Sequence, residues 1–287
     1  MTVVALTGSS GFVGSQLAER FSANGWSVVP FQRHATNEGK TTVTFNLGDD
    51  VNPDVFASRQ VDALVHCAYD FQVTSWPQIE RINVDGSRKL FAAANAGGVK
   101  HMVAVSTISA FEGCRSMYGR AKLEIEAAGT ALGASVIRPG LVFGGDLSRD
   151  GGMFGALKAS VRARIVPVID GGRYCQYLVH IDDLFALVSG LCEGALETDG
   201  KPITSASPRC WPMRDLLENL ARRQGFTPRF VSVPWQAVWL GLRTAELMGL
   251  RLGYRSDSVV SLVYQDPRPD FSGLQRVGIS PRDFTLA

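Results

Sequence analysis

The glycine-rich turn near the start of the chain restricts the fold more than any other segment. A short apolar run, residues 3–6, leads directly into the turn Thr7-Gly8-Ser9-Ser10-Gly11-Phe12-Val13-Gly14. We expect a buried strand before this turn and a helix after it. Gly8 would permit the tight turn, Gly11 would let a pyrophosphate approach the backbone, and Gly14 would let helix and strand pack closely. Backbone N–H groups at a helix N-terminus suit phosphates, so the segment predicts a dinucleotide site; the alternative is a turn that binds nothing.

The first half of the chain alternates short β-rich runs with helical patterns. Strands joined by helical crossovers form a parallel sheet with helices on both faces, and strands buried on both sides are continuous apolar runs. The predicted fold class is therefore α/β, a Rossmann-type doubly wound parallel sheet. The expected strands are 3–6, 27–31, 42–45, 63–67, 101–106 and 135–137, and the expected helices are 11–22, 51–58, 78–95 and 117–132.

The pattern changes after Phe143. Residues 144–152 are rich in Gly and Asp, which is typical of a loop, and about the last eighty residues are irregular and punctuated by prolines. At ~150 residues per domain, a chain of 287 residues holds about two units. We expect a helix at 153–161, a strand at 165–169, a Gly171-Gly172 turn, a helix from 181, a strand at 202–205 and a helix from 212 to about 224. The predicted division is an NAD(P)-binding Rossmann domain of residues 1–145 and 176–206, with a smaller substrate-binding lobe of residues 146–175 and 207–287.

The charge is almost balanced, with 29 Lys and Arg against 27 Asp and Glu. This gives no basic excess that would favour nucleic acid. No apolar stretch reaches the ~20 residues that span a bilayer. Within 235–242, Trp235, Val238, Trp239 and Leu242 share one helical face, which indicates a core or interface stripe. Membrane contact is the weaker alternative because the opposite face is not polybasic, so we expect no nucleic-acid and no membrane partner.

The cysteines predict a reducing environment. Their number is odd and no C-x-x-C pair occurs, which fits neither a disulfide framework nor a zinc site. No His, Cys, Asp and Glu set has metal-ligand spacing, so no metal is expected. The first residues lack the basic segment of a signal peptide, and we expect a cytoplasmic protein. The five cysteines are Cys67, Cys114, Cys175, Cys192 and Cys210.

The end of the second expected strand bears on the choice of cofactor. In dinucleotide sites an acidic residue there binds the ribose 2′-hydroxyl, whereas a nearby arginine accommodates a 2′-phosphate. This chain has no carboxylate at that place and offers Arg33. The sequence therefore favours NADP over NAD; a solvated loop arginine is the alternative.

Tyr118 and Lys122 stand one helical turn apart on one face of an expected helix. A phenol with an ordinary pKa of ~10 needs a shift of about 3 units, or roughly 4 kcal/mol, to act as a base near pH 7. A cation at ~4 Å supplies on the order of 4 kcal/mol at an effective dielectric constant of ~20. Lys122, together with the positive charge of an oxidised nicotinamide, could therefore activate Tyr118; a chance helical pair is the alternative.

The glycine spacing and the Tyr118-x-x-x-Lys122 pair together resemble the short-chain dehydrogenase/reductase superfamily. More narrowly, the chain resembles its extended branch, the NAD-dependent epimerase/dehydratase family. Five further segments resemble segments of the family and occur in the same order along the chain. They are Asn46-Leu47, Val65-His66-Cys67-Ala68, Asn83-Val84-Asp85-Gly86, Arg138-Pro139-Gly140-Leu141-Val142-Phe143-Gly144 and Val179-His180-Ile181-Asp182-Asp183.

The resemblance implies roles for individual residues. Hydroxyls that follow the fifth strand would face the site, and the family's substrate-polarising hydroxyl falls on Thr107, with Ser106 and Ser109 as alternatives. Tyr118 would exchange a proton with the substrate oxygen, and Lys122 would hold the nicotinamide ribose. The implied cofactor-binding residues are Gly8, Ser10, Gly11, Phe12, Val13, Gly14, Arg33, Asn46, Leu47, Cys67, Ala68, Tyr69, Asn83, Val105, Ser106, Tyr118, Lys122, Pro139, Leu141 and Val142.

The resemblance also implies hydride transfer between a nicotinamide and a carbonyl or hydroxyl carbon. The usual substrate of the family is a nucleotide-linked sugar. Ile108-Ser109 replaces the acidic pair of the family's dehydratases, which leaves epimerase and reductase as level alternatives. Gln176 stands where many members carry an arginine for the diphosphate, so another arginine would have to replace it. The candidates are Arg149, Arg162, Arg164, Arg173 and Arg209.

Two further expectations concern function class and partners. The alternative to an enzyme is an NADP-binding sensor or assembly protein without turnover, and the Tyr118–Lys122 pair argues against it. By analogy with the family, the expected helices 78–95 and 117–132 could pair across a two-fold axis as a homodimer.

Overall fold

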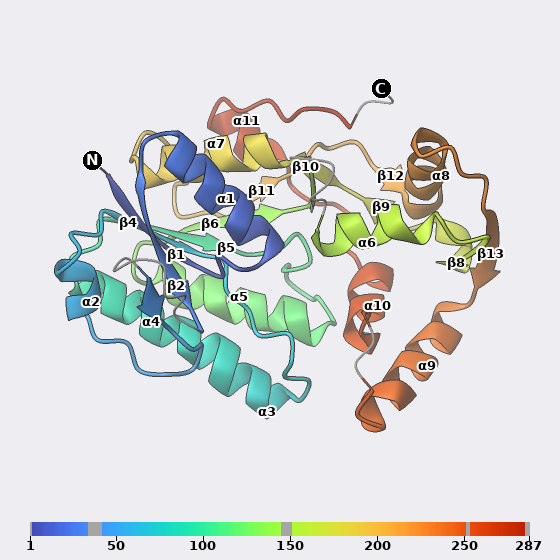
Figure 1. Ribbon diagram of the computed structural model, residues 1–287, viewed down its shortest axis with the longest axis horizontal. Helices are drawn as coiled ribbons and strands as arrows, with labels where there is room; N and C mark the ends of the chain where they lie inside the picture. The colour runs from blue at the N-terminus through green and yellow to red at the C-terminus, as the bar shows by residue number, and fades with distance from the viewer. Residues whose placement is uncertain (1, 34–41, 145–150, 251–252, 285–287) are drawn as a thin grey trace.

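A seven-stranded parallel sheet forms the centre of the protein, with the strand order β11-β6-β5-β4-β1-β2-β3 (Figure 1). The computed structural model describes residues 2–33, 42–144, 151–250 and 253–284. The order reverses between β1 and β4, and ligands of open α/β sheets bind at such a switch point, beyond the carboxyl ends of the strands. The predicted α/β doubly wound fold is confirmed. The strands of the sheet are β1 (Val3–Thr7), β2 (Ser27–Gln32), β3 (Val43–Thr44), β4 (Ala63–His66), β5 (His101–Val105), β6 (Ser135–Pro139) and β11 (Ile203–Ser205).

Both faces of the sheet are buried, which explains why its central strands are mostly apolar. Val4 and Leu6 of β1 join a core with α1 (Phe12–Ala23) and α7 (Ile181–Cys192). Ala5, which points to the opposite face, joins a second core. That second core is covered by α2 (Asp54–Ala57), α4 (Asp85–Ala96) and α5 (Met117–Thr130).

Two expected helices differ from those observed. Residues 51–58 form only the short helix α2, because Pro53 disfavours helical backbone in the residue before it. The expected helix 78–95 begins earlier and is interrupted. It consists of α3 (Trp76–Ile79), a π-helical turn (Glu80–Val84) and α4. The π turn contains Asn83, whose side chain is hydrogen-bonded to Asp70 in the loop after β4.

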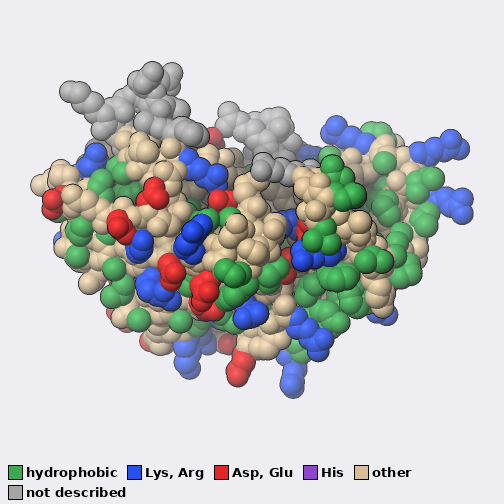
Figure 2. Space-filling model, turned by 90° about the horizontal axis from the view of Figure 1, so that it is seen from below, with side chains coloured by type: hydrophobic (Ala, Val, Ile, Leu, Met, Phe, Trp, Pro, Cys, Tyr) green, Lys and Arg blue, Asp and Glu red, His purple; other side chains and the backbone are tan. Residues whose placement is uncertain are grey.

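The remaining elements form a smaller region beside the carboxyl edge of the sheet. Its core joins aromatic and aliphatic residues from several of these elements, including Phe143, Phe154, Trp211 and Phe284. Seen from below, hydrophobic side chains are widespread on the right half of the molecule, and most acidic side chains lie on the left half (Figure 2). The elements are β7 (Leu141–Phe143), α6 (Gly152–Ser160), β8 (Ile165–Ile169), β9 (Cys175–Gln176), β10 (Leu178–His180), β12 (Trp211–Pro212), α8 (Met213–Arg223), β13 (Arg229–Val233), α9 (Trp235–Leu247) and α10 (Ser256–Val263). The last helix, α11 (Ser272–Arg276), packs instead against β11 of the sheet.

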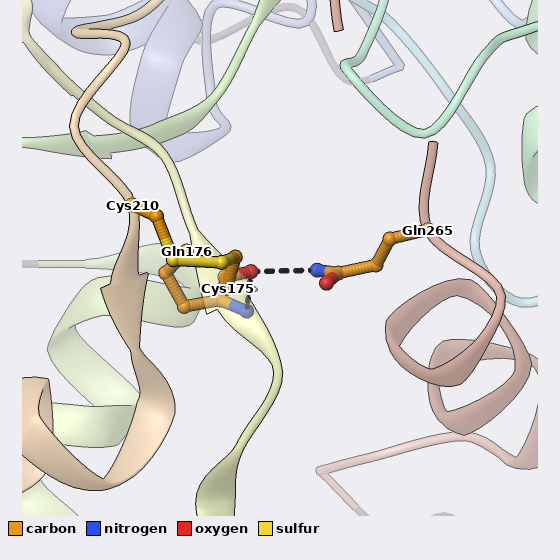
Figure 3. The surroundings of a disulfide bond; sticks show 4 residues. All are labelled: Cys175, Gln176, Cys210 and Gln265. Carbon is orange, nitrogen blue, oxygen red and sulfur yellow. Dashed lines mark hydrogen bonds between the residues drawn. A yellow bond between two sulfur atoms is a disulfide. The ribbon is translucent and has the colours of Figure 1, made fainter. Parts of the chain in front are cut away.

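The prediction that the cysteines form no disulfide is wrong for one pair. Cys175 and Cys210 are bonded, with 5.3 Å between their Cα atoms (Figure 3). The antiparallel pairing of β9 with β12, which sets Pro212 opposite Cys175, brings the two cysteines together. They are 35 residues apart in sequence, a separation that carries no spacing signal. The remaining cysteines, Cys67, Cys114 and Cys192, are free.

Among the helices that the structure describes, none has both the length and the hydropathy that a membrane span requires.

Candidate active site

The glycine turn has the close packing that its sequence predicts. Gly8 has φ +70°, and a Cβ there would lie 2.8 Å from the backbone nitrogen of Ala68. A Cβ on Gly14 would lie 2.2 Å from the Gly8 carbonyl oxygen, so helix α1 can approach β1 only with glycine there. A Cβ on Gly11 would meet only that same oxygen, at 3.3 Å, which leaves its outer side open. No side chain caps the helix at Gly11. The segment therefore fits a dinucleotide pyrophosphate: Gly8 to Gly14 would hold it through backbone N–H groups.

Arg33 directly follows β2, as predicted. Its side chain is 57% exposed, and its Nη2 lies 3.6 Å from the Asp70 carboxylate. Gln32, one residue earlier, donates a hydrogen bond from Nε2 to Ser9 Oγ at 2.9 Å. Arg33 is therefore available at the rim of the glycine turn, with one acidic neighbour that the sequence did not place there. Asn46 is exposed after β3 and donates to Asp49 at 3.1 Å.

Tyr118 lies in the first turn of α5, and three hydrogen bonds to Ser116 and Asp257 hold that turn. The hydroxyl of Ser116 caps the helix by accepting from the Gly119 N–H at 3.1 Å. Asp257 of α10 accepts from the N–H groups of Met117 at 2.8 Å and Tyr118 at 2.9 Å. Asp257 is 139 residues from Tyr118, and no pattern in the sequence singled it out. It connects the smaller region directly to the helix that carries the candidate catalytic phenol.

The aromatic ring of Tyr118 is packed against the loop after β4. The Tyr69 ring meets it edge to face with 4.9 Å between centroids, and Phe71 lies at 5.5 Å. Tyr69 directly follows Ala68, whose backbone packs on Gly8. The contact with Tyr69 therefore connects Tyr118 with the glycine turn. The Thr107 hydroxyl is hydrogen-bonded to Tyr118, so the two groups expected to contact the substrate oxygen lie together. Ser106, an alternative to Thr107, instead donates its hydroxyl hydrogen bond to the buried Glu126 carboxylate.

Burial controls the pKa values of the Tyr118–Lys122 pair. It raises the pKa of Tyr118 to about 12, and the hydrogen bond with Thr107 opposes part of that rise. It lowers the pKa of Lys122 to about 8. The Lys122 Nζ donates to the Val105 carbonyl oxygen at 3.0 Å and lies 5.4 Å from the Tyr69 ring centroid. The expected lowering of the Tyr118 pKa by Lys122 is not seen in this structure: burial raises that pKa, and the opposing contribution comes from Thr107.

Asn83 and His66 are fixed inside the protein. Asn83 is fully buried; its side-chain oxygen accepts from the Asp70 N–H at 2.6 Å and its amide donates to the Asp70 carbonyl at 3.2 Å. It therefore ties down the loop after β4, and a direct contact of its side chain with a cofactor is not supported. His66 lies between the hydroxyls of Thr7, at 2.7 Å, and Ser87, at 2.8 Å.

The other predicted cofactor residues are distributed around the same edge of the sheet. Cys67, Ala68 and Tyr69 follow β4, and Val105 and Ser106 are at the end of β5. Val142 of β7 is buried in the core that β1 forms with α1 and α7. Pro139 and Leu141 line the cavity described next, together with Thr107 and Tyr118. Ser10 is exposed in the glycine turn, Phe12 and Val13 are partly buried at the start of α1, and Leu47 packs on the second core.

A cavity of about 720 Å³ opens beside Tyr118 and Thr107. The side of this cavity formed by the loop after β5, by α5 and by α10 is the more polar one. The side formed by α6, β8, α8 and α9 is mostly apolar. The polar lining residues are Thr107, Ser109, Tyr118, Ser160, Tyr174, Gln176, Tyr177, Tyr254, Arg255, Asp257, Ser258, Ser261 and Gln265, and the apolar ones include Leu141, Met153, Leu157, Ile165, Val166, Val168, Ile169, Met213, Leu217, Val238 and Leu242.

Gln176 and Gln265 join the disulfide region to this cavity. Both side chains donate to the Cys175 carbonyl oxygen, at 2.7 Å and 2.6 Å (Figure 3). Gln176 is thus engaged at the place where the sequence comparison expected a diphosphate-binding arginine. Arg162, Arg164, Arg173 and Arg209 do not line the cavity, and Arg149 lies outside the described residues.

This fold and site define an extended short-chain dehydrogenase/reductase. Residues 4–193 match the NAD dependent epimerase/dehydratase family, and the chain belongs to that family of NAD(P)-dependent epimerases and reductases. Over 247 residues it is 26% identical to the ceramide reductase of Caulobacter vibrioides, a match that covers 81% of this chain and 74% of that protein.

Solved structures share the fold at lower identity. The UDP-glucose 4-epimerase of Thermotoga maritima, with UDP-glucose, matches with a TM-score of 0.74 and 18% identity over 98% of this chain and 94% of that one. The dTDP-4-dehydrorhamnose reductase of Bacillus anthracis, in complex with NADP, matches with a TM-score of 0.68 and 15% identity over 91% of this chain and 98% of that one.

Proposed function

We propose that the protein is an NADP-dependent reductase of a ketone carried by a substrate with a long apolar chain. The observation that supports this proposal is the cavity of about 720 Å³, polar beside Tyr118 and apolar beyond it. Such a cavity would hold the reacting carbonyl at the polar side and bury a hydrocarbon chain against α6, β8, α8 and α9. Burial of apolar surface would then supply much of the binding energy.

A nucleotide-linked sugar fits this cavity less well. A diphosphate carries negative charge and is recognised by cations, above all by the two-pronged guanidinium of arginine. Of the described residues that line the cavity, only Arg255 and Asp257 have charged side chains, and the two charges have opposite signs. The UDP-glucose in the Thermotoga epimerase structure is a property of that protein; here the lining favours a neutral, apolar substrate.

The relative in Caulobacter is a ceramide reductase by name. A ceramide is an amide lipid with two long hydrocarbon chains, which is the chemistry that the apolar lining of this cavity would accommodate. The name thus supports the substrate class proposed from the lining residues.

The roles of the residues follow from their geometry. The reduced nicotinamide, when bound, supplies a hydride to the carbonyl carbon. Thr107 would hydrogen-bond to the carbonyl oxygen, and Tyr118 would donate its proton to that oxygen as the C–O double bond becomes an alcohol. Since burial raises the pKa of Tyr118 to about 12, the phenol carries at neutral pH the proton that this step requires.

Arg33 supports NADP as the cofactor, because its exposed guanidinium at the end of β2 could pair with a 2′-phosphate. The pairing of Cys175 with Cys210 removes the cysteine argument for a reducing compartment, so the cytoplasmic location no longer has that support. The homodimer expected through α3, α4 and α5 stays a prediction.

A chain-length series tests the proposed function. Methyl ketones with alkyl chains of increasing length should be reduced with NADPH, and kcat/KM should rise about fourfold for each methylene that the cavity buries. UDP-glucose should give no turnover in either direction with NAD or NADP. A kcat/KM that does not depend on chain length, or turnover of UDP-glucose, would contradict the proposal.

A further inference from the structure

Three side chains on one face of α5 bind three consecutive residues, 105–107, at the end of β5. They are Tyr118, Lys122 and Glu126, each one helical turn after the one before. Tyr118 and Lys122 are the candidate catalytic pair. Glu126 is buried in the same row, although a carboxylate is among the side chains least often buried.

Residues 105–107 supply a partner to each member of the catalytic pair. The Val105 carbonyl oxygen accepts from the Lys122 Nζ at 3.0 Å. The Thr107 hydroxyl, two residues later, is hydrogen-bonded to Tyr118. A shift of this strand end relative to α5 would therefore disturb both catalytic contacts at once.

Glu126 holds the residue that lies between these two contacts. The Ser106 hydroxyl donates to the Glu126 carboxylate, and the Ser106 N–H donates to the Ile137 carbonyl oxygen of β6 at 2.7 Å. Arg138, the next residue of β6, donates to the same carboxylate from Nε at 2.9 Å and from Nη2 at 2.5 Å. The carboxylate of Glu126 thus joins α5, β5 and β6 through charge-assisted hydrogen bonds, which are the strong ones.

The same carboxylate is a negative charge next to Lys122. Burial lowers the pKa of Lys122 to about 8, and Glu126 opposes that fall. Other titratable groups around the ammonium come from β4, the loop after it and α5, namely His66, Cys67, Tyr69 and Tyr118. Burial lowers the pKa of the histidine to about 3 and raises the pKa of the thiol and of both phenols, so all four are neutral at pH 7. The charged groups near Lys122 are therefore Glu126 and, bound to it, Arg138.

We infer that Glu126 is a positioning residue of the active site, which fixes residues 105–107 against α5 and keeps a negative charge beside Lys122. It acts through Ser106 and Lys122 and is itself held by Arg138, without touching the substrate. A purely structural ion pair would need neither the bond to Ser106 nor the place beside Lys122. The inference rests on the proposed function only for the ketone used in its rate measurements.

The titration of Lys122 tests the charge of Glu126 without substrate or cofactor, and so separates it from the proposed function. In protein labelled with ¹³C at the lysine Cε, NMR follows each ammonium group as the pH rises, and the Lys122 signal is the one that Lys122→Gln lacks. Its midpoint in the wild type should lie near pH 8. Glu126→Gln should lower that midpoint by about one pH unit or more, because an opposite charge at ~4–6 Å has an effect of this size. Ser106→Ala keeps the carboxylate and should leave the midpoint unchanged.

Rates with a soluble ketone and NADPH test the hold on the strand end. Ser106→Ala and Glu126→Gln should each lower kcat roughly ten- to a hundredfold with little change in the KM for the ketone, because a small displacement of reacting groups costs this much. In Glu126→Gln the alkaline limb of the kcat profile should also move to lower pH, together with the Lys122 midpoint. Asp182→Asn is the matched control. It breaks the partly buried ion pair of Asp182 with Arg20, 2.7 Å long, which joins α1 and α7, and it should leave kcat and the alkaline limb unchanged.

Two results would overturn the inference. A Lys122 midpoint that Glu126→Gln does not move would remove the role of the charge. Wild-type kcat in both Ser106→Ala and Glu126→Gln, with stability lowered as in Asp182→Asn, would reduce Glu126 to a structural ion pair. Should Glu126→Gln fail to fold, Arg138→Lys keeps both the carboxylate and a cation, and its kcat should fall as in Ser106→Ala. If no ketone reacts with the wild type, the proposed function fails, and the titration of Lys122 still decides the inference.

Discussion

Asp257 should be a positioning residue for Tyr118, although it is outside the reacting atoms. The first N–H groups of a helix have no partner within the helix. In α5 the carboxylate of Asp257 accepts two of them, from Met117 and Tyr118, and Ser116 accepts the third, from Gly119. Asp257→Ala leaves two partly buried donors without a partner. At about 1–2 kcal/mol for each group, the free energy of unfolding should fall by roughly 2–4 kcal/mol.

Asp257→Ala should also lower kcat, and by more than its loss of stability alone implies. Without Asp257, the first turn of α5 is no longer held against α10, and a displacement of Tyr118 by ~1 Å costs on the order of a hundredfold in rate. Chemical denaturation gives the stability, and initial rates with a soluble ketone and NADPH give kcat and KM. We expect kcat to fall about a hundredfold with little change in the KM for NADPH.

Ser116→Ala is the matched control, since it removes one acceptor from the same helix end without touching α10. It should cost about 1 kcal/mol of stability and leave kcat near that of the wild type. Asp257→Asn, which keeps one acceptor oxygen, should be intermediate. If Asp257→Ala and Ser116→Ala lower kcat equally, or if neither does, the coupling between α10 and Tyr118 is refuted.

The other predictions concern the phenol, the cofactor and a buried histidine. Tyr118→Phe should lower kcat by about 10²- to 10⁴-fold while leaving the Kd for NADPH unchanged in titration; wild-type turnover would end the acid assignment. Arg33→Ala should raise the Kd for NADPH about tenfold and that for NADH little, and an unchanged ratio would argue against a 2′-phosphate contact. Burial lowers the pKa of His66 to about 3, so below pH ~6.5 the unfolded chain binds a proton that the folded protein does not. Stability should therefore fall by about 1.4 kcal/mol per pH unit from pH ~6.5 downwards, and His66→Gln should remove that part of the slope in denaturation curves.

The sequence predicted the sheet well because each strand is fixed by local information. Continuous apolar runs such as residues 3–6 and 101–106 have few alternatives when helical segments separate them. In the glycine turn, Gly14 is required by a local contact with Gly8, whereas Gly8 is required by its positive φ and by Ala68 in the loop after β4. Helix boundaries were less predictable. The π turn at Glu80–Val84 contains Asn83, which is hydrogen-bonded to Asp70, and hydrophobic periodicity gives no sign of such a contact.

The contacts of the smaller region could not be predicted from the sequence. The disulfide, the Asp257 cap and the Gln265 bond to the Cys175 carbonyl all join residues that are far apart in the chain. Each depends on how the elements of this region pack against the sheet, and single-sequence patterns record only near neighbours. The pKa of Tyr118 is a further case. The sequence shows that a cation stands one helical turn away, but the desolvation that raises the pKa is a property of the packed site.

Membership of the family leaves the substrate class open, and the residues of the cavity wall are what distinguish it. Thr107, Tyr118 and Lys122 are compatible with any hydride transfer to a carbonyl, so they do not distinguish a sugar from a lipid. The distinction lies in residues that have no catalytic signature, namely the apolar side chains of β8, α8 and α9 and the scarcity of cations beside them. If the cavity were to accept only short, polar ketones, its apolar lining would be left without a role.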